Sequence, residues 1–480
     1  MVKYNGNKVE GLKIAYIGGG SRGWAWGLMT DLAQASDLSG TVALYDIDYE
    51  AAKANETIGN RIALDNPDAN VDNFKYVATK TLEEALTGAD FVIVSILPGT
   101  FKEMESDVHA PEKYGIYQSV GDTSGLGGTI RALRTLPMYE LIAKAIEKNC
   151  PDAWVINYTN PMTLCVRMLY ETFPKIKAFG CCHEVFGTQR FLANMYCELN
   201  GMESWNAEEK KYTIPRDDIK VTVTGVNHFT WVTKATYKGT DLLEMLKPYA
   251  EKKLATPVDD EKPDDSDNNW ANLWRTMNRV KMDLFLRYGV LGAAGDRHLA
   301  EFCPNQWYLG SPENVWNWGF ALTPVAYRVD ELEKRLERSA RLASGEEQFK
   351  LAPTGEEGVR QMRALLGLSD LVTNVNIPNM GQIPDMPIGA VVETNAHFTA
   401  DSVMPVCAGP LPKQIKNLIE PISACQEMII EAVKNKDLYL AFRAFVNDPQ
   451  NNLSLEDSKK LFWEMCDNTK DYLRDYPEYK

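Results

Sequence analysis

Histidine is scarce in this chain, and three of its five histidines stand beside other groups that could do chemistry. Cys181-Cys182-His183-Glu184 and Asn227-His228 each follow an apolar, strand-like run. A thiolate, an imidazole and substrate hydroxyls together suit Mn²⁺, Fe²⁺, Co²⁺ or Ni²⁺. Cys182 and His228 are therefore candidate metal ligands, although two protein ligands are fewer than the three typical of catalytic zinc. Taken singly, each residue also fits a structural role in a buried core.

A second polar group is Gly295-Asp296-Arg297-His298-Leu299-Ala300-Glu301. It places four ionisable residues within six positions, close after Tyr288. Asp296 could simply cap the start of a helix. The alternative is a cluster for substrate binding or acid–base catalysis. Both interpretations remain open from the residues alone.

A glycine-rich motif directly follows the expected strand Leu12–Gly18. Gly18, Gly20 and Gly23 match the pattern G-x-G-x-x-G, and a helix-like stretch comes next. The first glycine permits a tight turn, the second lets the backbone approach a pyrophosphate, and the third lets helix and strand pack closely. The helix N-terminus then offers backbone N–H groups to phosphate. This order predicts a dinucleotide site.

Asp46 stands at the end of the second expected strand, Thr41–Asp46, and follows Gly23 by 23 residues. A carboxylate there accepts hydrogen bonds from the adenosine ribose and disfavours a 2′-phosphate, so NAD is preferred over NADP. Arg22, which follows the second glycine, keeps NADP open because it could also meet phosphate.

The elements that position these residues are predicted to form an α/β fold. Short runs rich in Val and Ile alternate with helix-like segments in the first 200 residues, which indicates a parallel sheet covered on both faces. We expect a doubly wound, Rossmann-like domain over residues 1–200. The further expected strands are Phe91–Leu97 and Trp154–Tyr158, and the expected helices are Glu50–Leu64 and Thr129–Lys148.

The pattern changes after about residue 200, and we expect an α+β domain over residues 201–480. Ile219–Thr224 and Phe229–Tyr237 alternate apolar and polar residues, as a half-exposed antiparallel pair does. Thr256–Asn269 is acidic and lacks an apolar pattern, so a solvated loop is expected. Further helices are expected at Val329–Leu342, Leu411–Asn435 and Ser454–Tyr472.

Composition narrows the class of protein. The 480 residues carry a formal net charge of −15. That field opposes binding to nucleic acid or to an anionic membrane surface. The beginning of the chain shows no apolar signal core, and no apolar run approaches the length of a membrane span. Nine scattered cysteines indicate free thiols, so a reducing cytoplasm is expected.

Together the motifs resemble glycoside hydrolase family 4, the NAD- and metal-dependent glycosidases, and the resemblance runs from end to end. The residues after the metal cysteine are similar to the branch that acts on α-linked uronic acids. The matching segments are KIAYIGGGS (13–21), NYTNPM (157–162), CHEV (182–185), GVNHFTW (225–231), GDRHLAEF (295–302), VNIPNMGQIPDMP (375–387) and VVETNAHF (391–398).

The resemblance implies roles for single residues. Cys182 and His228 match the family's metal ligands, and Asn160 matches its substrate-binding asparagine. His183 follows the metal cysteine, where some branches carry the general acid. Tyr288 lies near the place of the catalytic tyrosine base, with Asp296 and His298 as local competitors. Asp122 stands in the glycine-rich loop 119–128 near the nicotinamide, where relatives carry glutamate.

The implied reaction is hydrolysis of α-linked galacturonic acid, as in oligomers derived from pectin, with NAD and Mn²⁺ or another divalent metal. The family oxidises sugar C3, removes the C2 proton, expels the leaving group, adds water and reduces C3 again, so it needs no pair of flanking carboxylates. Arg297 is the candidate for binding the uronate carboxylate, with His298 beside it at the substrate. The resemblance also implies a homo-oligomer, either a dimer or a tetramer.

Three alternatives stay open. The first is a glucuronide or a neutral α-glycoside as the substrate within the same family. The second is an NAD-dependent dehydrogenase of hydroxy acids, which would form stoichiometric NADH. The third is a non-catalytic NAD-binding regulator, against which Cys182, His183 and His228 argue through the resemblance.

Overall fold

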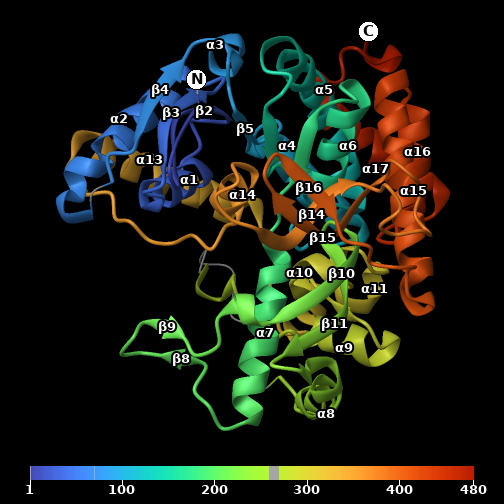
Figure 1. Ribbon diagram of the computed structural model, residues 1–480. Helices are drawn as coiled ribbons and strands as arrows, with labels where there is room; N and C mark the ends of the chain where they lie inside the picture. Colours follow the sequence, from blue (N-terminus) through green and yellow to red (C-terminus); the bar gives the residue numbers. More distant parts are fainter. Residues whose placement is uncertain (1, 70, 259–269) are drawn as a thin grey trace.

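The structure is a computed structural model that describes residues 2–69, 71–258 and 270–480. Its centre is a ten-stranded sheet whose parallel part has the order β4-β3-β2-β5-β6-β7 (Figure 1). This is the strand order of the dinucleotide-binding fold. The predicted doubly wound α/β class is confirmed. The strands are β2 (Lys8–Ile17), β3 (Leu38–Tyr45), β4 (Phe74–Thr79), β5 (Phe91–Val94), β6 (Trp154–Asn157) and β7 (Lys177–Gly180), and β1 (Lys3–Asn5) pairs with β2.

Helices cover both faces of this sheet because its strands are apolar on both sides, as the fully buried β5 shows. One face packs against α5 (Gly125–Asn149), α6 (Met162–Thr172) and the C-terminal helices. The other packs against α1 (Trp24–Gln34), α2 (Tyr49–Asp65) and α14 (Gly358–Leu365). The C-terminal helices are α15 (Lys413–Asn435), α16 (Leu438–Asn447) and α17 (Leu455–Asn468).

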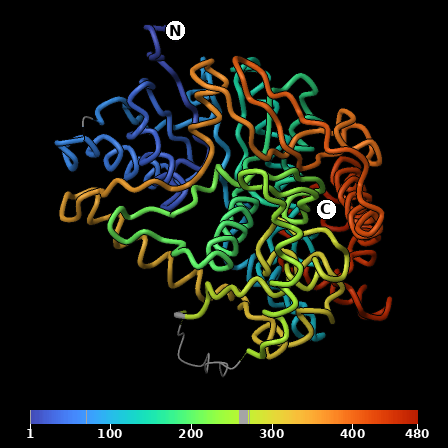
Figure 2. The backbone as a smooth tube through the Cα atoms, turned by 60° about the horizontal axis from the view of Figure 1, so that its bottom comes forward, coloured from blue at the N-terminus to red at the C-terminus, as the bar shows by residue number. Residues whose placement is uncertain are grey.

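The later part of the chain returns to the same sheet. β14 (Leu371–Pro378) pairs antiparallel with β7, and β15 (Val391–Thr399) and β16 (Ser402–Pro405) extend the sheet beyond it. α13 (Val325–Ser344) packs against α2 and α4 (Phe101–His109), beside the N-terminal part of the chain (Figure 2). The domain boundary at residues 200/201 stays a prediction, and the sheet continues across it.

A second, four-stranded sheet forms a smaller body below the first in Figure 1. β10 (Lys220–Val226) and β11 (Phe229–Tyr237) are antiparallel, which confirms that prediction. α7 (Glu184–Leu199) runs from the end of β7 into this body. Its other elements are β12 (Thr240–Asp241), β13 (Leu291–Gly292), α8 (Leu242–Ala255), α9 (Arg279–Tyr288), α10 (Asp296–Glu301), α11 (Asn305–Tyr308) and α12 (Pro312–Asn317).

Several short elements complete the chain, and most predicted boundaries shift by a few residues. The acidic loop prediction for Thr256–Asn269 falls largely on 259–269, outside the described residues. No described helix has both the length and the apolar composition needed to span a bilayer. The short elements are α3 (Leu82–Leu86), β8 (Trp205–Asn206), β9 (Lys211–Tyr212), η1 (Pro67–Ala69), η2 (Ala110–Tyr114), η3 (Arg216–Asp218), η5 (Trp270–Asn272), η6 (Lys470–Tyr472) and η7 (Pro477–Tyr479).

Candidate active site

The glycine-rich loop joins β2 to α1, as its sequence predicts. Gly18 has a φ of +91°, and a Cβ there would lie 1.9 Å from the carbonyl oxygen of Ser95. Only glycine fits such a position. The Gly20 N–H donates a 2.9 Å hydrogen bond to Asp46 Oδ2. A Cβ on Gly20 would lie 2.6 Å from the Cβ of Ala51, so this turn has no room for a side chain.

Gly23 and Gly19 have different neighbours from those that the motif predicts. A Cβ on Gly23 would meet the guanidinium of Arg335, on α13, at 2.8 Å. The glycine that lies against the neighbouring strand is Gly19, where a Cβ would be 2.8 Å from Leu44 of β3. At Gly23 the neighbour is therefore α13, a helix from the C-terminal half of the chain, and not the adjacent strand.

Asn55 holds the glycine loop in place, and our sequence reasoning missed it. Its amide nitrogen donates to the carbonyls of Gly19 and Ser21 at 2.8 and 3.0 Å. The indole N–H of Trp26 donates to its amide oxygen at 2.8 Å. Asn55 is fully buried, which an asparagine tolerates only when its polar atoms are paired. The available signal was an asparagine on the apolar face of α2.

The predicted metal ligands come from two different sheets. Cys182 follows β7 by two residues, at the carboxyl edge of the parallel strands where α/β folds bind ligands. His228 lies in the two-residue turn between β10 and β11, where Val226 pairs with Phe229. The φ of His228 is +65°, a strained conformation for a residue with a side chain, and such strain is concentrated at functional sites.

The ring of His228 is buried and held from two sides. Its Nδ1 lies 3.0 Å from Thr123 Oγ1, and the ring stacks on His298 with centroids 4.0 Å apart. Burial, together with the neighbouring His298, keeps the pKa of His228 well below its ordinary value. The ring is therefore neutral near pH 7. Because Thr123 occupies Nδ1, Nε2 is the nitrogen left for a metal.

Cys182 is also buried. Burial raises the pKa of its thiol well above the usual range, and the nearby Glu393 and Glu184 raise it further, while an Asn227 hydrogen bond opposes this rise. The Asn374 amide donates to the Cys182 carbonyl oxygen at 3.0 Å. A thiol in this environment becomes a thiolate only with a compensating positive charge, which a divalent metal ion supplies.

Asp122 and Asn160 form the next part of the site. We call these two residues its floor, and together with Cys182, His228 and His298 they make up what we call the cluster. The Asn160 amide nitrogen lies 3.5 Å from both carboxylate oxygens of Asp122. Burial alone would raise the pKa of Asp122, but Arg131 and then His228 and His298 outweigh it and hold the pKa well below its usual range. The Asn160 side-chain oxygen is buried and has no hydrogen-bond partner in the part of the chain that the structure describes. It is a free acceptor that a substrate hydroxyl can satisfy.

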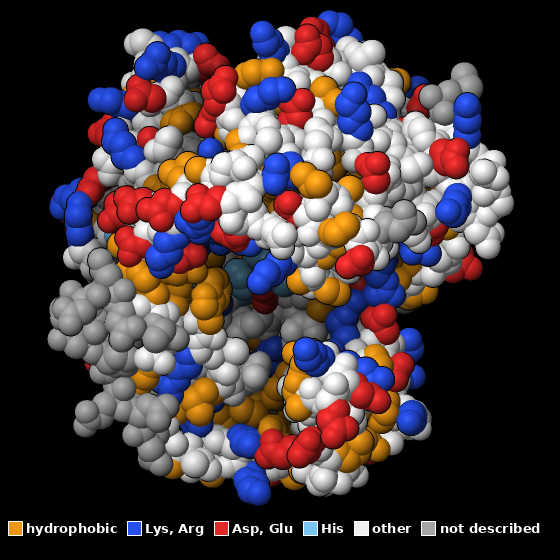
Figure 3. Space-filling view, turned by 90° about the vertical axis from the view of Figure 1, so that its left-hand side faces the viewer, with side chains coloured by type: hydrophobic (Ala, Val, Ile, Leu, Met, Phe, Trp, Pro, Cys, Tyr) orange, Lys and Arg blue, Asp and Glu red, His pale blue; other side chains and the backbone are white. Residues whose placement is uncertain are grey.

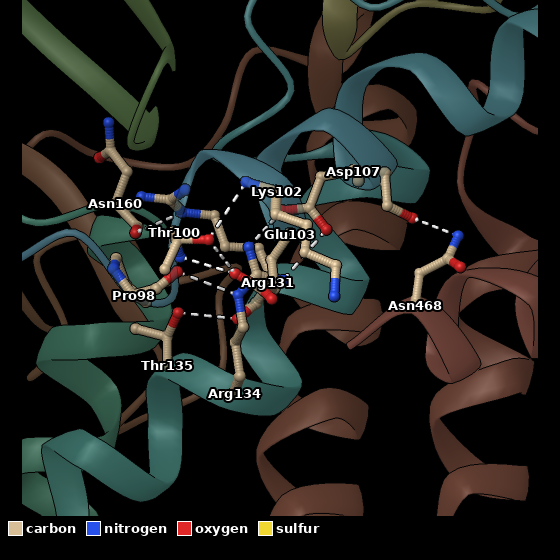
Figure 4. A network of polar contacts seen from close by, with 12 residues as sticks. Pro98, Thr100, Lys102, Glu103, Asp107, Arg131, Arg134, Thr135, Asn160 and Asn468 are labelled. Carbon is tan, nitrogen blue, oxygen red and sulfur yellow. Dashed lines mark hydrogen bonds and ion pairs between the residues drawn. The ribbon is translucent and has the colours of Figure 1, made fainter. Parts of the chain in front are cut away.

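Arg131 connects Asn160 to a buried polar network (Figure 4). Its Nε donates to the Asn160 carbonyl oxygen at 3.2 Å. One turn further along α5, Arg134 forms a fully buried ion pair with Asp107 and donates to the Pro98 carbonyl oxygen. Breaking such a buried pair leaves an uncompensated charge, so this network fixes α4 against α5 beneath the cluster.

Glu184 belongs to the cluster, although our sequence reasoning gave it no role. Its Oε2 accepts a 2.7 Å hydrogen bond from Gly295 N at the start of α10. Its Oε1 lies 3.6 Å from His298 Nε2 and 3.8 Å from His183 Nε2. Burial opposes ionisation, but the surrounding histidines outweigh it and set the pKa of Glu184 at about 2. The available signal was its position in the sequence, directly after Cys182 and His183 and before the strands of the second sheet.

His183 points from the cluster toward the cofactor loop. Its ring lies 6.3 Å from that of Trp24, the first residue of α1, and its Nδ1 is 2.9 Å from Glu356 Oε1. The hydrogen bond to Glu356 raises the pKa of His183 to about 9. The side chain is 50% exposed, so it can reach a bound ligand. On the face seen in Figure 3, a histidine lies inside a hollow with basic and acidic groups nearby.

Three of the predicted residues have other surroundings. Tyr288 ends α9 and packs edge-on against Trp231 at 6.3 Å, and its described contacts do not reach the histidine cluster. The carboxylate of Asp296 accepts from Lys281 N at 3.0 Å, so it caps the start of α9, whereas its own helix α10 has Gly295 as the N-cap. The terminal nitrogens of Arg297 donate to Thr323 Oγ1 at 2.7 Å and to the Leu273 carbonyl oxygen.

The arrangement fits a metal that takes few protein ligands. Within the described residues, no three His, Cys, Asp or Glu side chains form a ready-made metal cage. Cys182 and His228 are the predicted pair, and Asn227, which precedes His228, forms a hydrogen bond with Cys182. The buried side-chain oxygens of Asn160 and Asn227 have no partner among the described residues. A divalent ion held by this pair would keep open positions for sugar oxygens.

Comparison with known proteins gives the family. The model of the family 4 glycosyl hydrolases matches residues 13–198, and that of their C-terminal domain matches residues 223–451. An alpha-galacturonidase of Thermoanaerobacterium saccharolyticum is 58% identical over 98% of both chains.

Solved structures agree with this assignment. The crystal structure of a Bacillus subtilis protein described as a glucosidase has a TM-score of 0.86 at 47% identity, covering 95% of this chain and 100% of that one. A 6-phospho-beta glucosidase of Thermotoga maritima, solved with manganese, NAD⁺ and glucose-6-phosphate, shares the fold at a TM-score of 0.72 and 21% identity, covering 96% and 99%. The resemblance seen in the sequence is thus confirmed, and this chain belongs to glycosyl hydrolase family 4.

Proposed function

We propose that this family 4 glycosyl hydrolase cleaves α-linked galacturonides, such as oligomers derived from pectin, with NAD and a divalent metal such as Mn²⁺. The observation that carries the proposal is the group of side chains around His228. Asn227, its neighbour in the chain, forms a hydrogen bond with Cys182, and Asp122, on which His228 acts, lies 3.5 Å from Asn160. Support for a galacturonide as the substrate comes from the alpha-galacturonidase that is 58% identical over 98% of both chains.

The residues present suit both cofactors. NAD would supply a reversible hydride acceptor and the metal a Lewis acid for sugar oxygens. The loop Gly18–Gly23 and the start of α1 would hold the pyrophosphate, and Asp46 the adenosine ribose. Cys182 Sγ and His228 Nε2 would hold the metal. Asn160 Oδ1, which lacks a partner, would accept a hydrogen bond from the sugar.

His183 is proposed as the general acid that protonates the departing glycosidic oxygen. Its side chain is half exposed between the cluster and the start of α1, and Glu356 Oε1 at 2.9 Å orients the ring. Asp122 is proposed as a catalytic residue in the loop near the nicotinamide. Of the residues considered as C2 base, His298 lies in the cluster with a buried, unpartnered Nδ1, whereas Tyr288 lies at the end of α9.

The test is incubation of the protein with α-1,4-linked galacturonate oligomers, NAD⁺ and Mn²⁺ under reducing conditions. We expect release of free galacturonate without net formation of NADH, and slower turnover when C2 carries deuterium. α-Glucuronides and neutral α-glycosides serve as controls. Stoichiometric NADH without release of sugar would instead identify a dehydrogenase, and faster cleavage of a control glycoside would replace the galacturonide as substrate.

We further propose that the protein acts in the cytoplasm as a homo-oligomer. The free cysteines support a reducing compartment, because most of them are buried and unpaired in the described structure. Light scattering of the purified protein distinguishes a dimer or tetramer from a monomer of 53.9 kDa.

A further inference from the structure

A substrate with a carboxylate at C6 poses a problem for this chain, which carries a net charge of −15. Some cation near the cluster must neutralise that carboxylate. Arg131 and Arg328 act electrostatically on Asp122, and Arg297 acts on Glu184. Their existing contacts distinguish them.

Arg131 and Arg297 are already engaged. Arg131 is buried, donates from Nε to the Asn160 carbonyl oxygen, and lies close enough to Asp122 to be the main charge that stabilises that carboxylate. Arg297 donates from both terminal nitrogens, to Thr323 Oγ1 and to the Leu273 carbonyl oxygen, and stacks at 4.9 Å over the Trp274 ring. These contacts use two of the five N–H donors of Arg297 and direct its guanidinium toward Thr323 and the 273–274 segment.

Arg328 is different. Its Nε is buried without a hydrogen-bond partner, and no carboxylate within the described ranges forms an ion pair with it. The residue as a whole is half-buried. Leaving a buried N–H unpaired costs free energy, so a ligand that accepts from Nε is expected. Its charge acts on Asp122, on Arg131 and on Arg297, so it lies near the cluster.

The chain fixes Arg328 in this position from its first helical turn. It lies three residues after Val325, where α13 begins. Thr323 N donates to the Ser119 carbonyl oxygen at 2.9 Å, and Val325 N donates to His109 Nε2 at 3.2 Å. Ser119 opens the loop that carries Asp122, so the start of α13 is attached to the floor of the cluster.

We propose that Arg328 binds the C6 carboxylate of the sugar and so determines the preference for uronides. A guanidinium offers paired N–H donors that match the two carboxylate oxygens. This inference rests on the proposed function. It assigns the carboxylate to Arg328 instead of Arg297, and leaves Arg297 to order the 273–274 segment through Leu273 and Trp274.

The experiment compares Arg328→Gln and Arg328→Lys with wild type, all with NAD⁺ and Mn²⁺. Arg341→Gln is the matched control, because Arg341 lies on the same helix and pairs with Glu347 at the surface. The substrate is 4-nitrophenyl α-D-galacturonide. Free D-galacturonate and D-galactose, which differ at C6, are tested as competitive inhibitors.

For Arg328→Gln we expect KM for the galacturonide and Ki for galacturonate to rise about 100-fold, with kcat within about threefold of wild type. Ki for galactose should stay unchanged. Arg328→Lys should lose about 10-fold, because an ammonium restores the charge without the bidentate geometry. A purely structural role would weaken both inhibitors equally.

Equal losses for the two inhibitors, or unchanged binding of galacturonate, would overturn the inference. A wild-type enzyme that leaves the galacturonide intact overturns the proposed function separately. Arg328 is then judged by calorimetric binding of free galacturonate. Unchanged affinity in Arg328→Gln rejects its role, and a selective loss relative to galactose retains it.

Discussion

The two halves of the active site are built in different ways. The cofactor loop is local, because Gly18–Gly23 and Asp46 come from two adjacent strands, and Gly20 N bonds directly to Asp46. The cluster is assembled from distant segments, since Cys182 follows β7 and His228 occupies the β10–β11 turn. A local site can be recognised from the spacing of its residues in the sequence, whereas an assembled site depends on how two sheets pack.

Their electrostatics differ in the same way. In the cofactor loop, Asp46 is satisfied by the backbone N–H groups of Gly20 and Asp48. In the cluster, charged groups stabilise one another through space, and the histidines set the pKa of Glu184 at about 2. Removing one member of such a network changes all the others. Changes in the cluster should therefore affect turnover, and changes in the loop should affect cofactor affinity.

The largest expected effect is that of Cys182→Ser. We expect kcat/KM to fall on the order of 1000-fold with Mn²⁺, because a Lewis acid is worth several kcal/mol and serine is a poorer ligand for it. Affinity for Mn²⁺ should fall in parallel, while the Kd for NAD⁺ stays within about threefold. Kinetics, metal analysis and calorimetry measure the three quantities.

The matched control is Cys407→Ser, which changes an exposed free cysteine in the segment that follows β16. It should behave as wild type in all three measurements. Full activity and full metal content in Cys182→Ser would remove Cys182 from the site. Equal loss of NAD⁺ affinity would show that the two halves are not independent.

What could be predicted from the sequence follows this division. The parallel sheet, the glycine loop and Asp46 were predictable because their signals lie in strand periodicity and fixed spacing. Cys182 and His228 stood out only as residue types after strands, and the family resemblance supplied their roles. Glu184 and Asn55 carried only weak signals in the sequence, since their function comes from contacts across the fold. The close neighbour of Gly23 could not be foreseen, because α13 lies more than 300 residues later.

The next effect should come from Gly20→Ala. The added Cβ would lie 2.6 Å from Ala51 Cβ and 2.9 Å from Asp46 Oδ2, so the turn must open. We expect NAD⁺ affinity to fall about 10- to 100-fold, with Mn²⁺ binding unchanged. Fluorescence titration with NADH and calorimetry with NAD⁺ provide the measurement.

Gly27→Ala is the control for this change, because Gly27 lies inside α1 and its Cβ would approach Thr354 Cγ2 only to 3.4 Å. Alanine is a better helix former than glycine, so this variant should keep its cofactor affinity and be no less stable. If Gly27→Ala loses NAD⁺ as strongly as Gly20→Ala, the whole helix rather than the turn controls binding.

The smallest effect concerns Glu301, which joins two segments within the cluster. Its Oε1 accepts from Val120 N and Gly121 N at 2.7 and 2.8 Å, so α10 is linked to the loop before Asp122. Burial raises the pKa of Glu301 to about 8, from an ordinary value of 4.5. Between these values the unfolded chain loses its proton while the folded chain retains it. The stability from this group is therefore complete below pH 4.5 and lost as the pH rises toward 8.

Glu301→Gln stays neutral at every pH and keeps one acceptor oxygen. We expect the unfolding free energy of wild type to fall relative to this variant between pH 5 and pH 9, on the order of 1–3 kcal/mol, in urea titrations. Glu456→Gln, an exposed carboxylate on α17, should follow the wild-type curve. Parallel curves for wild type and Glu301→Gln would mean that Glu301 is ionised in the folded protein. The link between α10 and the loop before Asp122 would then be a charged one, and Glu301 would join the charged groups that stabilise one another in the cluster.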